Sequence, residues 1–309
     1  MSTVRHFIDL HEWSSKDLWR IIQLAVHLKA EWQSGGNRPV LGGKTLGMIF
    51  QKPSLRTRVS FDVAMEHLGG HAIILGPDEI GLGKRESIAD IARVLSGYVQ
   101  FIAARVFSHQ HVTELAKWSR VPVINMLSDD SHPCQAMADA LTIYEEFGRL
   151  QGLKVAYIGD GNNVAASLLE AAAHFGMQFT IATPKGYELP MPVWDRVKPF
   201  AEATGATFKA FHDPDKAVED AHVVYTDTWV SMGQEKESEK RLAIMRPYQV
   251  NRHLMEGADR NAIVLHCLPA HRGDEITDEI ADGPNSRVFQ QAENRLHAQK
   301  AILVELLKQ

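Results

Sequence analysis

Hydrophobic and polar positions follow two different periods along the chain, and these periods predict strands that alternate with helices. Thr45–Phe50 is a short, mostly apolar run of the kind that forms a buried strand. A polar break follows, and apolar residues then recur at helical spacing up to Gly69 and Gly70, which end the predicted helix. These apolar residues are Phe61, Ala64, Met65 and Leu68. Ser54–Arg58 therefore lies where a strand ends and a helix begins.

The same alternation continues along the rest of the chain. Apolar runs predict further strands at His71–Leu75, Val99–Ala104, Val121–Met126, Val223–Thr226 and Ala262–His266. Helical spacing predicts helices within 14–32 and at 88–95, 112–118, 136–149 and about 292–308. At Leu153 a second series of strand, polar loop, helix and strand begins with the layout of the first half. The fold class predicted is α/β, with two doubly wound parallel-sheet domains joined by long helices.

The two halves of the pattern also predict the domain boundaries. At roughly 150 residues per domain, the 309 residues of the chain correspond to about two domains. We expect residues 1–135 to form the first domain and residues 136–289 the second. The final helix is rich in apolar residues and needs a partner surface, so we expect about 290–309 to complete the first domain.

Composition and charge exclude several classes of protein. Apolar content of 45% and charged content of 23% are typical of a globular protein, and 33 basic against 38 acidic residues give a net charge of −5. This charge does not favour nucleic-acid binding, and no apolar run reaches the roughly 18 residues of a membrane span. The first residues lack the apolar core of a signal peptide, and the two cysteines form no Cys-x-x-Cys pair. We therefore expect a cytoplasmic protein.

The first candidate site is Ser54–Arg58, with the sequence Ser-Leu-Arg-Thr-Arg. The backbone N–H groups and the positive dipole end of a helix N-terminus favour an anion. Two hydroxyls and two guanidiniums at the same place add charge-assisted donors. This combination predicts a phosphate-binding site without the Gly-Lys-Ser/Thr sequence of a P-loop. The alternative is a capped surface helix with two solvated arginines.

Other residues with reactive or charged side chains also follow predicted strands, at the edge where parallel sheets bind ligands. Arg105 ends one strand and could be a solvated charge or a ligand contact. His132 and Gln135 precede a helix, where the imidazole could serve as a donor or an acid and the amide as a donor. Cys267 ends another strand and would be a nucleophile only with a lowered pKa; otherwise it is a buried, inert thiol.

These runs, in this order, resemble the aspartate/ornithine carbamoyltransferase family over nearly the whole chain. The resemblance implies that residues matching the phosphate-binding sequence hold carbamoyl phosphate: Ser54, Leu55, Arg56, Thr57 and Arg58. It implies that further residues contact the same substrate, near the carbamoyl group or the phosphate: Arg105, His132, Gln135, Cys267, Leu268 and Arg295. It implies a cis Leu-Pro bond after Cys267. Of these residues, the expected catalytic ones are Arg56, Arg105, His132 and Cys267.

The second substrate is predicted from Asp227–Gly233, Asp-Thr-Trp-Val-Ser-Met-Gly, which resembles the Ser-Met-Gly loop of the ornithine-specific members. The resemblance implies that Asp227 and Ser231 hold the α-amino group of ornithine, and that Met232 and Asn163 hold its carboxylate. A carboxylate suits a cationic amine, whereas a site for aspartate needs arginines, and 227–236 contains none. The implied reaction transfers the carbamoyl group to the δ-amine of L-ornithine and gives L-citrulline and phosphate. The alternatives are a related amine (N-acetylornithine, putrescine or aspartate) and a non-catalytic relative.

Two positions depart from the family pattern. Leu55 stands where many ornithine enzymes have Thr, a change that is harmless if this position acts through its backbone N–H. Gly81 stands where some relatives carry a His or Gln that reaches a neighbouring subunit's site. The resemblance implies a homotrimer or a multiple of trimers, but it does not say which residue of a neighbour reaches the site. It also leaves open a biosynthetic or a catabolic role.

A dinucleotide-binding site is the main competing interpretation. Gly159 and Gly161 follow a strand and open a helix, but Val164 stands where the fingerprint needs a third glycine or alanine. The next strand ends without an acidic residue for a ribose. His109 and His111 are two residues apart, and the chain has no His-Glu-x-x-His sequence. We therefore expect no cofactor and no metal ion.

Overall fold

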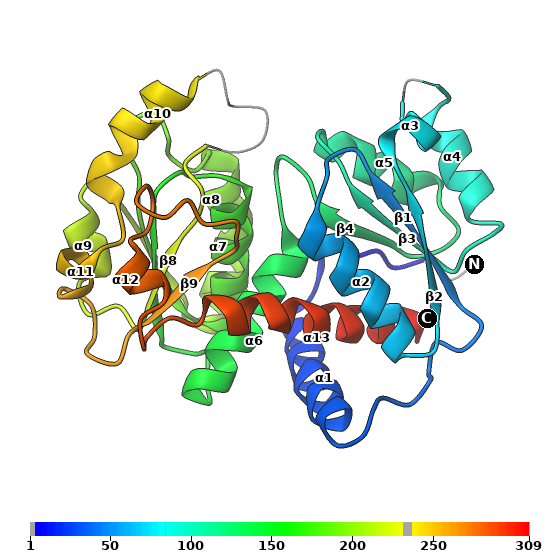
Figure 1. The fold of residues 1–309 in the computed structure, drawn as a ribbon, viewed down its shortest axis with the longest axis horizontal. Helices are drawn as coiled ribbons and strands as arrows, with labels where there is room; N and C mark the ends of the chain where they lie inside the picture. The colour runs from blue at the N-terminus through cyan, green and yellow to red at the C-terminus, as the bar shows by residue number, and fades with distance from the viewer. Residues whose placement is uncertain (1–3, 84, 231–236, 309) are drawn as a thin grey trace. The chain divides into compact units, whose positions relative to one another are not determined.

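The computed structural model shown in Figure 1 describes residues 4–83, 85–230 and 237–308. It divides into two compact units. Unit 1 comprises Met1–Ala138 and Asn294–Gln309, and unit 2 comprises Asp139–Glu293. Each unit contains one sheet in which every pair of neighbouring strands is parallel, as predicted for an α/β fold. No helix among the described residues has the length and hydropathy of a membrane span.

Unit 1 is built on a four-stranded sheet in the order β2-β1-β3-β4. The strands are β1 (Thr45–Phe50), β2 (His71–Leu75), β3 (Phe101–Arg105) and β4 (Val123–Leu127). The helices wholly within this unit are α1 (Ser15–Gln33), α2 (Leu55–His67), α3 (Pro77–Ile80), α4 (Ile88–Leu95) and α5 (His109–Trp118), with a 3₁₀ turn at Leu10–Glu12. The strand order reverses between β1 and β3, which makes the carboxyl ends of these two strands the expected ligand-binding edge.

Unit 2 is built on a five-stranded sheet in the order β7-β6-β5-β8-β9. The strands are β5 (Lys154–Ile158), β6 (Gln178–Ala182), β7 (Thr207–Phe211), β8 (Val223–Thr226) and β9 (Ile263–His266). The helices are α7 (Asn163–Phe175), α8 (Met191–Thr204), α9 (Pro214–Val218), α10 (Ser238–Met245), α11 (Arg252–Met255) and α12 (Asp278–Ala281), with a 3₁₀ turn at Arg246–Tyr248. Helices cover both faces of this sheet: α7 packs with α8, and α9 packs with α11 (Figure 1). Here the order reverses between β5 and β8.

The burial of the strands explains why their sequences are continuous apolar runs. All five residues of β3 and the last five of β1 are buried, as parallel strands covered on both faces require. In unit 2, β5 and β8 follow the same rule, and their side chains pack into a core with Trp229 and Met245. Charged side chains are confined to the ends of these strands, with Arg105 last in β3 and Lys154 first in β5.

Several helices and strands begin or end at residues other than those predicted. The strand predicted from Val99 begins at Phe101, because the Val99 N–H closes the turn after α4 by donating to Leu95. The predicted polar loop 78–87 contains α3, whose first turn forms because the Glu79 carboxylate accepts the Gly76 N–H at 2.6 Å. Gly81, with a φ of 52°, ends this helix in the left-handed conformation that glycine adopts without strain.

Two long helices contain the boundaries between the units. α6 (Pro133–Phe147) and α13 (Val288–Leu307) are each divided, after Ala138 and after Glu293 respectively. α6 begins three residues before its predicted start because Pro133 suits the first helical position, where no N–H is needed. The final helix begins at Val288, four residues before its predicted start.

Candidate functional site

The phosphate-binding sequence forms the start of α2. Ser54 is extended, with a φ of −161°, and its hydroxyl accepts a hydrogen bond from the Thr57 N–H at 3.4 Å. It is therefore the N-cap of a helix that begins where the sequence pattern predicts. The Leu55 side chain is 75% exposed, Arg58 is also exposed, and Arg56 is half-buried. The backbone N–H groups of this turn and the two guanidiniums are groups suited to an anion at the end of β1.

A buried basic cluster lies in the same unit. Arg295, from α13, donates from Nη2 to the Thr57 hydroxyl over 2.6 Å, and both side chains are buried. Arg105 is the last residue of β3 and pairs in register with Phe50, the last residue of β1. Because parallel strands end at one edge, the residue that closes β3 lies beside the strand that leads into α2. The sheet register and α13 thus supply two arginines to this part of unit 1.

His132 lies within the field of both arginines. Burial, and next the charges of Arg295 and Arg105, hold the pKa of its imidazole well below the ordinary value of 6.5. The ring is therefore neutral at physiological pH and can donate one hydrogen bond, while the arginines supply the positive charge. Gln135, on the first turn of α6, is also buried. Burial raises the pKa of the neighbouring Cys134 thiol to about 12, so this cysteine is inert.

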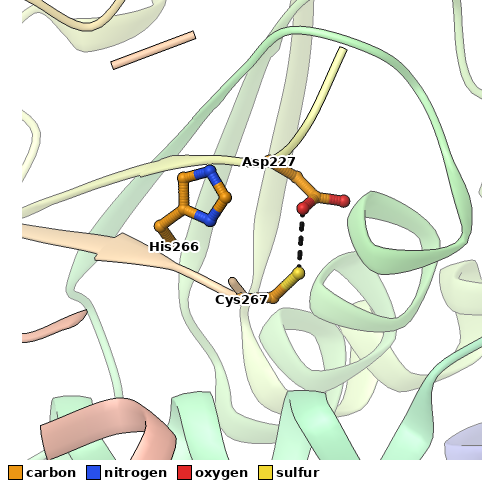
Figure 2. Close-up of side chains that lie close together, drawn as sticks. All are labelled: Asp227, His266 and Cys267. Atoms are coloured by element: carbon orange, nitrogen blue, oxygen red, sulfur yellow. Dashed lines mark hydrogen bonds between the residues drawn. The ribbon is translucent and has the colours of Figure 1, made fainter. Parts of the chain in front are cut away.

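The edge residues of unit 2 are brought together by the register of three adjacent strands. Ile158 pairs with Thr226, and Thr226 pairs with His266, so the residues that follow β5, β8 and β9 leave the sheet at one level. Asp227 is the first residue after β8, and Cys267 is the first after β9. The Cys267 thiol donates to the Asp227 carboxylate at 2.8 Å (Figure 2).

Asn162 holds the same carboxylate, a contact that the sequence pattern did not indicate. Its side-chain oxygen accepts the N–H groups of Val164 and Ala165 at 3.0 and 3.1 Å, which caps α7. Its amide nitrogen is then directed at Asp227 and donates over 2.8 Å. Asp227 is 5% exposed and accepts two hydrogen bonds, so it is held rigidly at the carboxyl end of β8.

Two side chains, His266 of β9 and Glu275, fix the backbone that follows Cys267. The Leu268–Pro269 bond is cis, as the family resemblance implies, and Leu268 has a φ of 57°. The Leu268 N–H donates to His266 Nδ1 at 2.9 Å, and His266 Nε2 lies 3.0 Å from the Glu275 carboxylate. Since Nδ1 accepts, Nε2 carries the proton and donates to Glu275. This buried pair was not predicted from the sequence.

Asp227, His266 and Cys267 lie close together (Figure 2). Each offers one atom of a type that binds metals, and these three atoms lie within 4.8 Å of one another. The hydrogen bonds argue against a resident ion. Both nitrogens of His266 are engaged, and the Cys267 thiol donates to Asp227. A metal would require a deprotonated thiolate and a ring nitrogen released from its partner. The arrangement fits a carboxylate that binds a cationic group better than it fits a metal site.

A buried ion pair connects the loop after β5 to the loop that contains Asp227. Arg241, on α10, forms an ion pair with Asp160 and donates from Nε to the Trp229 carbonyl at 2.7 Å. Burial raises the pKa of Asp160, although Arg241 acts to lower it.

The turn after β5 leaves no room for a side chain at Gly161. A Cβ on Gly161 would lie 2.5 Å from the Leu189 backbone nitrogen. Gly161 is thus needed for packing against the chain itself, and this packing argues against a pyrophosphate at this turn.

The remaining predicted residues differ in what the structure describes. Asn163 is the first residue of α7 and is half-buried. Ser231 and Met232 lie outside the described residues, so their expected contacts with ornithine stay predictions. Asn162, Asp160, Arg241 and Glu275 are the site residues that the sequence pattern missed. For Asn162 a signal was present, because an N-cap at the end of a strand leaves the amide nitrogen free to reach the next strand end.

Comparisons with known proteins match both units. A family profile described as the aspartate/ornithine carbamoyltransferase carbamoyl-P binding domain matches residues 5–145. A second profile, described as the Asp/Orn binding domain of the same proteins, matches residues 151–306. The ornithine carbamoyltransferase of Anoxybacillus flavithermus is 53% identical over 303 residues, which are 98% of this chain and 96% of that protein.

Solved structures agree with the sequence matches. The ornithine carbamoyltransferase of Pyrococcus furiosus superposes with a TM-score of 0.95 at 52% identity, covering 98% of this chain and 96% of that chain. The ornithine transcarbamoylase of Giardia lamblia superposes with a TM-score of 0.90 at 34% identity, covering 99% of both chains. The similarity therefore includes both sheets and the strand ends that carry the candidate residues.

Proposed function

Because the chain belongs to the aspartate/ornithine carbamoyltransferase family, we propose that it transfers the carbamoyl group of carbamoyl phosphate to the δ-amine of L-ornithine. The observation that carries the choice of ornithine over aspartate is the buried Asp227 carboxylate, which offers its remaining lone pairs to a cation. An aspartate substrate would instead place another carboxylate beside this charge. The names of the relatives support the same choice.

We assign carbamoyl phosphate mainly to groups of unit 1, with Leu268 of unit 2 as a further contact. Ser54, Arg56 and Arg58 hold the phosphate together with the backbone N–H groups of α2, including that of Leu55. Arg105, His132 and Thr57 face the carbamoyl oxygen. Gln135 and Leu268 contact the carbamoyl group, and Arg295 orients Thr57 through their 2.6 Å hydrogen bond. Asn163, Asp227, Ser231 and Met232 hold the amino-acid end of ornithine.

The reaction then needs orientation and charge placement more than covalent catalysis. The neutral δ-amine attacks the carbamoyl carbon, a C–N bond forms, and the C–O bond to phosphate breaks. The amine gives up one proton, and the departing phosphate takes up this proton and keeps the electrons of the broken C–O bond. Negative charge that grows on the carbonyl oxygen is stabilised by Arg105, by the neutral His132 and by the Thr57 hydroxyl. We assign the Cys267 thiol a contact near the reacting centre, and in the structure it donates to the Asp227 carboxylate.

We further propose a homotrimer, or a multiple of trimers, in the cytoplasm. Of the eleven large apolar side chains that are exposed among the described residues, nine belong to unit 1, including Leu55, Val59, Ile73 and Tyr98. Such a concentration on one unit favours a subunit interface there. Both cysteines are free thiols, which fits a reducing compartment. Light scattering during gel filtration tests the trimer, and a monomeric mass would contradict it.

A colorimetric assay for carbamoyl transfer tests the function. Purified protein receives carbamoyl phosphate with ornithine, aspartate, N-acetylornithine or putrescine in separate wells, without added metal or NAD. Product in the ornithine well alone is the expected result. Product with another amine alone would keep carbamoyl transfer but overturn the assignment of Asp227. No product in any well would favour a non-catalytic relative.

A further inference from the structure

His109, the first residue of α5, lies between two buried groups from different parts of unit 1. Its Nε2 atom is 3.2 Å from the Asp9 carboxylate, and its Nδ1 atom is 2.8 Å from the Ser128 hydroxyl. Asp9 is 3% exposed and Ser128 is 0% exposed. We call these three side chains the Asp9–His109–Ser128 relay. The groups assigned above to carbamoyl transfer do not include it.

The chemistry of the three groups gives each hydrogen bond of the relay a direction when His109 is neutral. Burial alone raises the pKa of Asp9, but hydrogen bonds from His109 and Ser131 bring it below its usual value, so the carboxylate is ionised. A carboxylate only accepts, so His109 Nε2 donates to it and Nδ1 accepts from the Ser128 hydroxyl. The Ser128 oxygen then accepts the Ser131 N–H, 3.3 Å away.

The same order of groups occurs in nucleophilic triads, but here it cannot serve that chemistry. A triad serine must reach a substrate carbonyl, and Ser128 is fully buried. Its oxygen is also committed to the Ser131 N–H. The relay can therefore act only on the protein around it. The part of the protein that it can affect is the turn that Ser128 begins.

That turn leads directly to a residue assigned to carbamoyl phosphate. The Ser128 N–H donates to the Ser131 carbonyl at 2.9 Å, and the Asn125 amide donates to the Ser131 hydroxyl at 2.9 Å. His132 is the next residue, and its ring is buried beside Arg105 and Arg295. Since Ser128 and Ser131 close the turn, the bond from His109 to Ser128 fixes the peptide from which the His132 side chain departs.

The relay also joins this turn to the loop that follows Arg105. His109 comes four residues after Arg105, so one imidazole ties the loops after β3 and β4 together. Two backbone hydrogen bonds of 2.9 Å run between the same loops, from Val106 to Leu127 and from Asp129 to Phe107. Asp9 reaches His109 because the N-terminal segment runs beside β4, where the Phe7 N–H donates to the Val123 carbonyl at 2.8 Å.

We propose that His109 is a positioning residue for carbamoyl phosphate, holding the turn 128–132 so that His132 and Arg105 face one carbamoyl group. This inference rests on the proposed function. Anchored through Asp9 to the N-terminal segment, His109 orients His132 through Ser128 and touches neither substrate itself. The bond to Ser128 is the part that matters for binding, and the bond to Asp9 holds the ring in place.

Three substitutions of His109 separate these two bonds. The amide of His109→Asn reaches about as far as Nδ1 and retains the bond to Ser128, whereas that of His109→Gln reaches about as far as Nε2 and retains the bond to Asp9. Calorimetric titration with carbamoyl phosphate should give a Kd about five- to tenfold higher for His109→Ala, at about fivefold per hydrogen bond. His109→Gln should resemble His109→Ala, His109→Asn should remain close to wild type, and the KM for ornithine should stay unchanged in all three.

Arg20→Gln is the matched control, because Arg20 pairs with the buried Glu305 in the same unit and does not contact the turn. It should lower the melting temperature without changing the Kd. The inference is overturned if the three His109 variants bind like wild type, or if all three weaken binding in proportion to their loss of melting temperature. Wild-type protein that binds carbamoyl phosphate but makes no citrulline would overturn the proposed function alone. Wild-type protein that binds no carbamoyl phosphate would overturn both.

Discussion

Replacing Asp227 with asparagine removes one charge from the proposed ornithine site and leaves its shape nearly unchanged. The carboxylate accepts hydrogen bonds from Asn162 Nδ2 and from Cys267 Sγ, both at 2.8 Å. A carboxylate has about four lone-pair sites, so about two remain for the substrate ammonium. The amide of the Asp227→Asn variant would offer one oxygen and would turn its NH₂ group towards at least one of the present donors. The substitution therefore affects both the substrate and the protein.

The expected magnitudes follow from these contacts. A hydrogen bond to a charged group contributes about 1.5–3 kcal/mol, which corresponds to a factor of about 10–150 in a binding constant. We expect the KM for ornithine to rise by this factor in Asp227→Asn. Carbamoyl phosphate should bind as before, because most of its assigned groups lie in unit 1. Leaving one buried donor without a partner should also cost about 1–3 kcal/mol of unfolding free energy.

Initial rates of citrulline formation at saturating carbamoyl phosphate measure the first effect, and calorimetric titration with carbamoyl phosphate checks the second. Asp195→Asn is the control, since it removes an exposed carboxylate of α8 in the same unit. It should leave both constants unchanged. A folded Asp227→Asn protein with the wild-type KM for ornithine would refute the assignment of Asp227, whatever happens to its stability.

Three further predictions concern unit 1. Arg56→Ala should abolish detectable carbamoyl phosphate binding in calorimetry while circular dichroism shows an intact fold; normal binding would remove the phosphate site from the proposal. Arg295→Lys keeps the charge but loses the planar guanidinium that reaches Thr57, so the Kd for carbamoyl phosphate should rise about tenfold in the same titration. The pKa of His132 lies well below 6.5 in the folded protein, so its contribution to stability is fully present above about pH 6.5 and is lost as the pH falls below this value. Urea midpoints between about pH 5 and about pH 7 should show a weaker pH dependence for His132→Gln than for wild type, and an equal dependence would contradict the burial argument.

Local patterns were sufficient to predict the parts of the site that depend on sequence neighbours. The apolar run Thr45–Phe50 is a strand with the predicted bounds, and Ser54 caps the helix that follows. Arg105 and His266 are each the last residue of a strand, and Asp227 is the first residue after one. Such positions follow from the hydrophobic period and from the polar residues that end each apolar run, because a parallel strand covered on both faces admits few polar residues until it ends.

Pairings between distant residues could not be predicted in this way. Asp160 and Arg241 are 81 residues apart, and Asp9 lies in a segment with no periodic pattern of its own. Their contacts depend on strand order and on which loops leave the sheet at the same level. The reversal between β5 and β8 brings Asn162 to Asp227, although 65 residues separate them. A sequence period carries no information about such a reversal.

The residues of unit 1 assigned to carbamoyl phosphate and those of unit 2 assigned to ornithine carry opposite charges, and each charge suits its proposed substrate. In unit 1 the positive charge comes from arginines, which stay protonated at any physiological pH, while burial keeps His132 neutral as a hydrogen-bond donor. The charge that faces the carbamoyl phosphate anion therefore does not change with pH. In unit 2 the negative charge is one carboxylate fixed by two neutral donors, which leaves it uncompensated until a cation binds. The proton that must leave before the reaction belongs to the δ-amine of ornithine, so the protein binds the substrate's permanent charges and leaves the titrating amine free to attack.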